Sequence, residues 1–196
     1  LAVQQKRVVL AMHGWRSCWA RDFGAIGDFL RDSGCTVLYA EQRGQNESGG
    51  EYMGFGLTER YDCRDWANWA AERFGPEMPL YLTGVSMGAT TVLMAAGLDL
   101  PASVRGIAAD CGFTSPDAIL RHGASQRFPR LPAGAALAPM RVLAPVLAGY
   151  CLAGCSTLAA LRAANYPVLF IHGEADTFDP CRMSEEGYLA CRTEKE

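Results

Sequence analysis

A glycine-flanked segment near the middle of the sequence has the residue types of a nucleophilic centre. Residues 84–88 read Gly-Val-Ser-Met-Gly, the pattern G-x-S-x-G. They follow the apolar run 80–82 and precede the helix-like stretch 89–98. That context is typical of a sharp strand-to-helix turn that exposes a reactive serine. We therefore predict that Ser86 is a nucleophile; the alternative is an ordinary glycine-rich turn.

The residues around Ser86 are also suited to stabilise negative charge. A side chain two residues before or after the serine would clash in such a turn, which explains the choice of Gly84 and Gly88. The turn directs the N–H group of Met87 and the start of the following helix towards the reaction centre. We expect this N–H group to bind an oxygen that becomes negatively charged during the reaction.

Apolar runs and helical patterns alternate along the chain, and these elements must position the serine. Such alternation predicts an α/β fold, with a mostly parallel sheet and helices on both faces. One of the expected helices covers 58–74, with Thr58 as its N-cap. The expected strands are 7–12, 36–40, 80–83, 104–109 and 167–171.

The polar residues that follow these strands are expected to meet at one edge of the sheet. In parallel sheets, ligands bind beyond the carboxyl ends of the strands. Such polar residues occur after all five expected strands: His13, Arg43, Ser86, Asp110 and Asp176.

A long helical insertion, about 114–165, interrupts the alternation and contains the longest apolar stretch of the chain, 131–161. Several prolines and Arg141 break it, so it does not have the uninterrupted length of a membrane-spanning helix. We expect about two short helices that form a cap-like insertion within a single domain, 1–196. Five of its side chains could line an acyl pocket or could simply pack together: Met140, Leu143, Val146, Leu147 and Tyr150.

Composition narrows the function classes. The 196 residues are 49% hydrophobic and 20% charged, with a net charge of −3, which suits one globular domain. The sequence has no basic stripe, so we expect neither a nucleic acid nor a membrane as partner. The eight cysteines show no metal-binding spacing and are interpreted as reduced core thiols of a cytoplasmic protein, with a disulfide framework as the alternative.

The order of these motifs resembles the α/β-hydrolase superfamily across nearly the whole chain. The matching segments are His13-Gly14, residues 84–88 and the segment 172–176, which reads His-Gly-Glu-Ala-Asp. More narrowly, the chain is similar to bacterial single-domain esterase-like hydrolases of the serine aminopeptidase-like and monoglyceride-lipase-like kinds. The resemblance implies four functional residues: Ser86 as nucleophile, Trp15 and Met87 as backbone donors of the oxyanion hole, and Asp176 as the acid of the catalytic triad.

The sequence departs from the family pattern in two places. The segment 41–48 resembles a D-x-R-G-x-G-x-S loop, but Glu41 replaces the Asp and Asn46 replaces the second Gly. The triad order is Ser, acid, His, and no histidine follows Asp176. We expect the triad histidine beyond residue 196. We also expect residues 193–196 to form the turn that leads into a further strand, which is not present. Strands are likewise expected to be missing before 7–12.

The other titratable candidates have simpler interpretations. We expect structural roles for His13 and His172 and a solvated position for His122. Asp110 is the second candidate for the triad acid, although hydrogen bonding within its own turn is the favoured interpretation.

The sequence therefore predicts a serine hydrolase that needs no cofactor and no metal. The favoured substrate is a small-molecule carboxylic ester with a small or medium acyl group. Amide, peptide or thioester hydrolysis is the alternative on the same triad. A non-catalytic hydrolase-like binding protein is the alternative if no histidine is encoded beyond residue 196.

Overall fold

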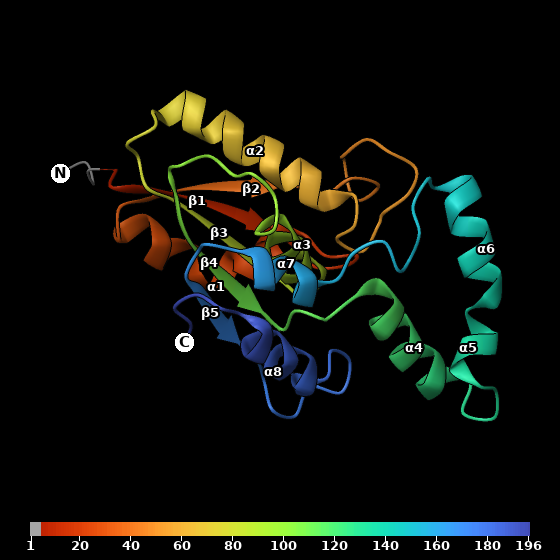
Figure 1. Cartoon of the computed structure of the whole chain (residues 1–196). Coiled ribbons are helices and arrows are strands. Elements are labelled where there is room, and N and C mark those ends of the chain that lie inside the picture. Colours follow the sequence, from red (N-terminus) through yellow and green to blue (C-terminus); the bar gives the residue numbers. More distant parts are fainter. Residues whose placement is uncertain (1–4) are drawn as a thin grey trace.

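A parallel β-sheet forms the centre of the molecule (Figure 1). The computed structural model of the protein describes residues 5–196. Its five strands have the order β2-β1-β3-β4-β5, and every neighbouring pair is parallel. This topology confirms the expected α/β-hydrolase-like sheet. The strands are β1 (Arg7–Met12), β2 (Cys35–Ala40), β3 (Leu80–Val85), β4 (Val104–Asp110) and β5 (Val168–Ile171).

Helices cover both faces of the sheet, as the alternation of patterns predicts. On one face, buried side chains of β1 and β3 pack against α2 and α3 in the main hydrophobic core. On the other face, α1 lies over side chains such as Val9 and Tyr81, with which it lines a groove. The helices are α1 (Trp19–Asp32), α2 (Glu59–Phe74), α3 (Met87–Ala95), α4 (Pro116–Arg127), α5 (Ala133–Ala136), α6 (Ala138–Leu147), α7 (Thr157–Ala163) and α8 (Cys181–Ala190).

The start of α2 differs from the expectation. Thr58 occupies the N-cap position, but its side chain makes no capping hydrogen bond. The carboxylate of the next residue, Glu59, instead accepts hydrogen bonds from the backbone N–H groups of Gly54 (2.5 Å) and Gly56 (2.8 Å). Glu59 is fully buried. The helix start is therefore fixed to the preceding loop through Glu59.

The insertion at 114–165 contains four helices, α4 to α7, rather than the expected two. Figure 1 shows α4, α5 and α6 extending away from the sheet as a cap. In contrast, α7 packs on the sheet layer, with Leu161 in the main core. In the part of the chain that the structure describes, no helix is long and apolar enough to cross a membrane.

The last residues extend the sheet instead of forming only a turn. The N–H of Val168 donates to the carbonyl oxygen of Glu194 (3.0 Å), and the N–H of Phe170 donates to that of Glu196 (2.9 Å). Lys195 forms a parallel bridge with Val168. The expectation of a turn at 193–196 is therefore wrong for the end of this segment, which pairs with the β5 edge.

Candidate active site

Ser86 lies in a strained turn between β3 and α3. Its φ is 53° and its ψ is −114°, a combination that non-glycine residues rarely adopt and that is concentrated at functional sites. A Cβ atom at Gly84 would overlap the backbone of Gly88, and one at Gly88 would overlap the carbonyl oxygen of Met12. Both glycines are therefore required by close backbone approach. The strand and the helix that the sequence predicts on either side of Ser86 are present.

Two backbone segments meet beside the Ser86 hydroxyl. Met87 is the first residue of α3, so its N–H group has no acceptor within the helix. On the other side, Gly14 packs against the serine: a Cβ atom added at Gly14 would lie 3.5 Å from the Ser86 Cβ atom. Trp15 follows Gly14 and lines the cavity next to Ser86. The structure thus brings Trp15, Ser86 and Met87 together, as the sequence predicts.

The loop that carries Trp15 is held by a carboxylate of α1. Asp22 accepts hydrogen bonds from the Gly14 N–H (2.7 Å) and from the Ser17 hydroxyl (2.6 Å). The segment 41–48 supports the same loop, because the Asn46 side chain donates to the Ser17 carbonyl oxygen (2.8 Å). Asn46 has a φ of 51°, which asparagine tolerates better than most residues. This explains how asparagine replaces a glycine of the motif.

Asp176 lies at the same edge of the sheet, in the turn that follows β5. Its Oδ1 atom accepts the backbone N–H groups of Phe178 (2.8 Å) and Asp179 (2.9 Å). Its Oδ2 atom lies 3.9 Å from His172 Nε2. The Oδ1 atom of Asp176 therefore stabilises the turn, whereas its Oδ2 atom accepts neither of these two hydrogen bonds.

The sequence analysis did not single out Asp179, a buried carboxyl group in the same cavity as Ser86. Asp179 is 3% exposed and lines the cavity with Ser86. Burial raises the pKa of its carboxyl, and the hydrogen bond with the Ser86 side chain opposes that rise. The only signal in the sequence is a second acid three residues after Asp176, which does not reveal burial.

Asp110, the second candidate for the acid, supports the nucleophile through its backbone. Its carbonyl oxygen accepts the Ser86 N–H (2.8 Å). Burial raises the pKa of the Asp110 carboxyl, and nearby His172 partly offsets the rise. Asp110 therefore contributes a partly buried carboxyl to the same edge.

The three histidines are held by groups other than the Ser86 hydroxyl. The ring of His13 is buried between the Gly14 carbonyl oxygen (2.8 Å) and the Gln42 N–H (3.1 Å). His172 pairs with Ser184 Oγ (2.6 Å). His122 on α4 contacts the Thr177 carbonyl oxygen (3.0 Å). Within residues 5–196, no recorded hydrogen bond joins a histidine ring to Ser86.

One group of side chains has the donor atoms of a metal site. Cys111, Asp176 and Asp179 each place one such atom within 4.8 Å of the others. Burial, together with the nearby carboxylates, raises the pKa of the Cys111 thiol to about 12. Because a metal binds the thiolate, this environment disfavours Cys111 as a ligand at neutral pH. All eight cysteines of the chain are free.

An apolar cavity of about 520 Å³ opens beside Ser86. Its walls come from the Trp15 loop, from Phe55 and Phe113, and from the cap. The cap residues are those of α4 and its neighbourhood: Ile119, Leu120, Gly123, Ala124, Arg127, Phe128 and Leu137.

The five cap side chains considered from the sequence do not line this cavity. Leu143, Val146 and Leu147 are at least half exposed on α6, because that helix packs through its other face. Tyr150 donates a hydrogen bond to the Met53 carbonyl oxygen (2.7 Å) and ties the cap to the loop before α2. Of the two alternatives that the sequence leaves open for these residues, the structure does not support their role as walls of this cavity.

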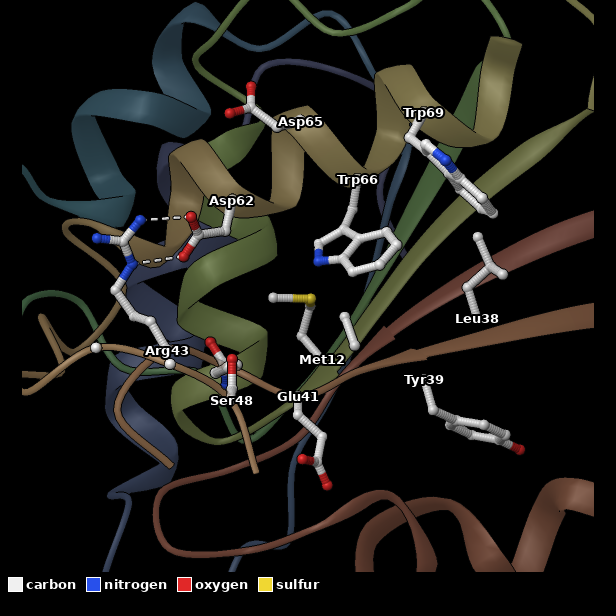
Figure 2. Close-up of a pocket in the computed structure, with 14 residues that line it drawn as sticks. Met12, Leu38, Tyr39, Glu41, Arg43, Ser48, Asp62, Asp65, Trp66 and Trp69 are labelled. Carbon is white, nitrogen blue, oxygen red and sulfur yellow. Dashed lines mark hydrogen bonds and ion pairs between the residues drawn. The ribbon is translucent and has the colours of Figure 1, made fainter. Parts of the chain in front are cut away.

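A larger cavity, of about 910 Å³, lies beside β2 and away from Ser86. Figure 2 shows the Trp66 and Trp69 rings extending from α2 towards Met12 and Leu38. Arg43 and Asp62 form an ion pair at its rim, with 2.6 Å between Nε and Oδ2. Arg43, which the sequence places after a strand, therefore lies apart from the Ser86 cavity.

Comparisons with known proteins agree with this geometry. The family model for serine aminopeptidase, S33, matches residues 3–131. An uncharacterized protein of Bacillus subtilis (strain 168), YqkD, is 29% identical over 157 residues, which cover 80% of this chain and 51% of that protein. The chain thus spans about half the length of this curated relative.

Solved structures share the fold at low sequence identity. The esterase Pf2001 of Pyrococcus furiosus is 21% identical, with a TM-score of 0.74 over 98% of this chain and 72% of its own. Acetyl xylan esterase 1 from Thermoanaerobacterium sp. JW/SL YS485 is 15% identical, with a TM-score of 0.68 over 98% of this chain and 67% of its own. With the family match over more than half of the sequence, the chain belongs to the serine aminopeptidase S33 family of the α/β-hydrolase superfamily.

Proposed function

We propose that the protein is a serine hydrolase that cleaves small-molecule carboxylic esters with a small or medium acyl group. The observation that carries this proposal is the strained Ser86 turn at the mouth of an apolar cavity of about 520 Å³. A cavity of this kind binds an acyl chain and leaves its carbonyl carbon near the serine. The esterases among the structural neighbours support the same reaction class.

The proposed reaction passes through an acyl-enzyme. Ser86 Oγ attacks the ester carbonyl carbon while a base takes the hydroxyl proton, and the same base returns the proton to the leaving alcohol. The N–H groups of Trp15 and Met87 bind the oxyanion, each contributing about 3–4 kcal/mol to transition-state stabilisation. Asp176 orients the base, which we propose is a histidine encoded beyond residue 196. Water then hydrolyses the acyl-enzyme.

Reaction with a fluorophosphonate probe tests the nucleophile. The full-length protein should carry one adduct at Ser86 and should turn over p-nitrophenyl esters. Ser86→Ala should lose both, with a fall in kcat of at least about 1,000-fold. Ser48→Ala is the matched control, because Ser48 lines the larger cavity beside β2. Ester turnover that survives in Ser86→Ala, or labelling that maps to another residue, would contradict the proposal.

Amide or peptide hydrolysis is the second candidate, favoured by the description of the matching family. A panel of p-nitrophenyl esters, thioesters and aminoacyl anilides with the same acyl groups separates these reactions. We expect the highest kcat/KM for esters. Anilides that are cleaved faster than the matched esters would assign the protein to the peptidase reaction instead.

A further inference from the structure

The carboxyl group of Asp179 is buried against the proposed nucleophile. Asp179 and Ser86 line the same cavity, and the Ser86 hydroxyl lowers the pKa of the Asp179 carboxyl, which burial raises. Only 3% of Asp179 is exposed, and its Oδ1 atom has no hydrogen-bond partner among residues 5–196. Burying a carboxylate without full pairing is unfavourable by several kcal/mol. Packing alone therefore does not explain an acid at this position.

The backbone on both sides of Asp179 is fixed, so its side chain has a defined direction. Its N–H donates to Asp176 Oδ1 (2.9 Å), and its carbonyl oxygen lies 2.6 Å from His172 Nε2. The other nitrogen of His172 pairs with Ser184 Oγ (2.6 Å), which also donates to the Gly112 carbonyl oxygen (3.3 Å). These contacts link the turn to α8 and to the end of β4. The network holds Asp179 beside Ser86.

The groups around Asp179 carry an excess of negative charge. Asp176 in the same turn raises the pKa of the Asp179 carboxyl, whereas His172 after β5 and His122 on α4 lower it. Asp110 at the end of β4 adds a third carboxyl to this edge, and it too interacts with Asp176. Cys111 lies among them as a thiol. A positive charge that forms here during the reaction is therefore stabilised.

We propose that Asp179 is a second carboxyl group of the catalytic site, which stabilises the positive charge that the base acquires. This inference rests on the proposed function. A base that contacts both Ser86 and Asp176 must lie close to Asp179, because Asp179 lines the cavity together with Ser86 and its carboxyl lies within 4.8 Å of the Asp176 carboxyl. The proton moves from Ser86 Oγ to the base and then to the leaving alcohol. Asp179 supplies charge and takes no proton.

The pH dependence of kcat/KM in the full-length protein tests this role. A carboxylate within about 4–6 Å favours the charged form of a base and raises its pKa by about 1–3 units. Asp179→Asn should therefore move the acid limb of the profile down by about 1 unit or more. Glu174→Gln removes an exposed acid from the same loop and is the matched control, which should keep the wild-type profile.

Stability measurements separate this role from a structural one. Because Asp179 is buried without full pairing, removing its charge should leave Tm unchanged or raise it. Asp179→Val is a second charge-removing variant if the asparagine variant does not fold. If the acid limb of the Asp179→Asn profile coincides with that of the wild type, the inference is overturned, even if the plateau value of kcat/KM changes. Failure of the probe to label Ser86 in the wild-type protein would instead overturn the proposed function itself.

Discussion

The two cavities of the molecule differ in how their charged groups are compensated. At the larger cavity beside β2, Arg43 and Asp62 neutralise each other at the partly exposed rim. At the smaller cavity beside Ser86, Asp179 is buried and lacks a full set of partners. Natural folds accept such an unfavourable group mainly where it contributes to function. The proposed reactive cavity is therefore distinguished by uncompensated charge next to a strained serine and not by its size.

The two cavities also differ in how tightly their backbones pack. The turn that carries Ser86 leaves no space for a Cβ atom at Gly88, whereas a Cβ atom at Gly49, beside the larger cavity, would meet nothing within 4 Å. The turn that carries Ser86 therefore allows only one backbone geometry. Beside the larger cavity, position 49 has room for a side chain.

The largest effect is expected from substituting Gly88, with Gly49 as the matched control. Gly88→Ala should destabilise the protein by at least about 3 kcal/mol, the upper end of the usual range for overpacking, because its methyl group meets the Met12 carbonyl oxygen. That loss corresponds to a fall in Tm of about 6–12 °C. Gly49→Ala should change Tm by less than about 2 °C. Thermal unfolding of both variants measures the difference, and equal Tm values would show that the two regions do not differ.

A smaller effect is expected from narrowing the cavity beside Ser86. Ala124 on α4 lines it, so Ala124→Phe should exclude the distal part of longer acyl chains. Loss of burial of about two methylene groups corresponds to about 1.6 kcal/mol, or a roughly 10-fold fall in kcat/KM. We expect this fall for octanoyl esters and little change for acetyl esters.

A matched control for this variant is Ala135→Phe, at an exposed position of α5 outside the cavity. It should leave the chain-length profile unchanged. If Ala124→Phe lowers acetyl and octanoyl ester turnover equally, the apolar cavity is not the acyl site.

The smallest effect is expected at the rim of the larger cavity. Arg43→Met removes the ion pair with Asp62, whose side chains are 40% and 30% exposed. Because solvent screens such a pair, the loss of stability should be below about 1 kcal/mol, which is at most about 4 °C in Tm. Probe labelling of Ser86 should keep its wild-type rate. A loss of labelling would link the two cavities and remove the contrast between them.

The strands and the Ser86 turn were predictable from the sequence because local patterns determine them. The alternation of apolar runs and the two glycines around Ser86 report backbone requirements that act over a few residues. The place of His13 at the same edge as Ser86 followed from the rule that ligands bind at the carboxyl ends of parallel strands. Trp15 was singled out by the resemblance to the α/β-hydrolase superfamily.

Other features depend on contacts between distant segments and could not be read from the sequence. The burial of Asp179 results from its turn packing on Ser86, which lies 93 positions earlier in the chain. The same limit explains why the sequence left open whether Val146 is a pocket residue: helical spacing shows that a face exists but does not show what it meets. Glu59, rather than Thr58, fixes the start of α2 through hydrogen bonds to the preceding loop. The path of that loop is likewise determined by tertiary packing.

The apolar walls and the polar residues of the cavity come from different parts of the chain, and this separation has an evolutionary consequence. The cap contributes apolar walls through α4 and Leu137, whereas Ser86, Asp176 and Asp179 follow strands of the sheet. Under the proposed function, mutations in the cap can therefore change which acyl groups fit without disturbing the proposed reacting residues. Selection for a new substrate can therefore alter residues of the cap while the polar residues of the site stay the same. We expect the sequences of related proteins to diverge fastest between Pro116 and Leu147.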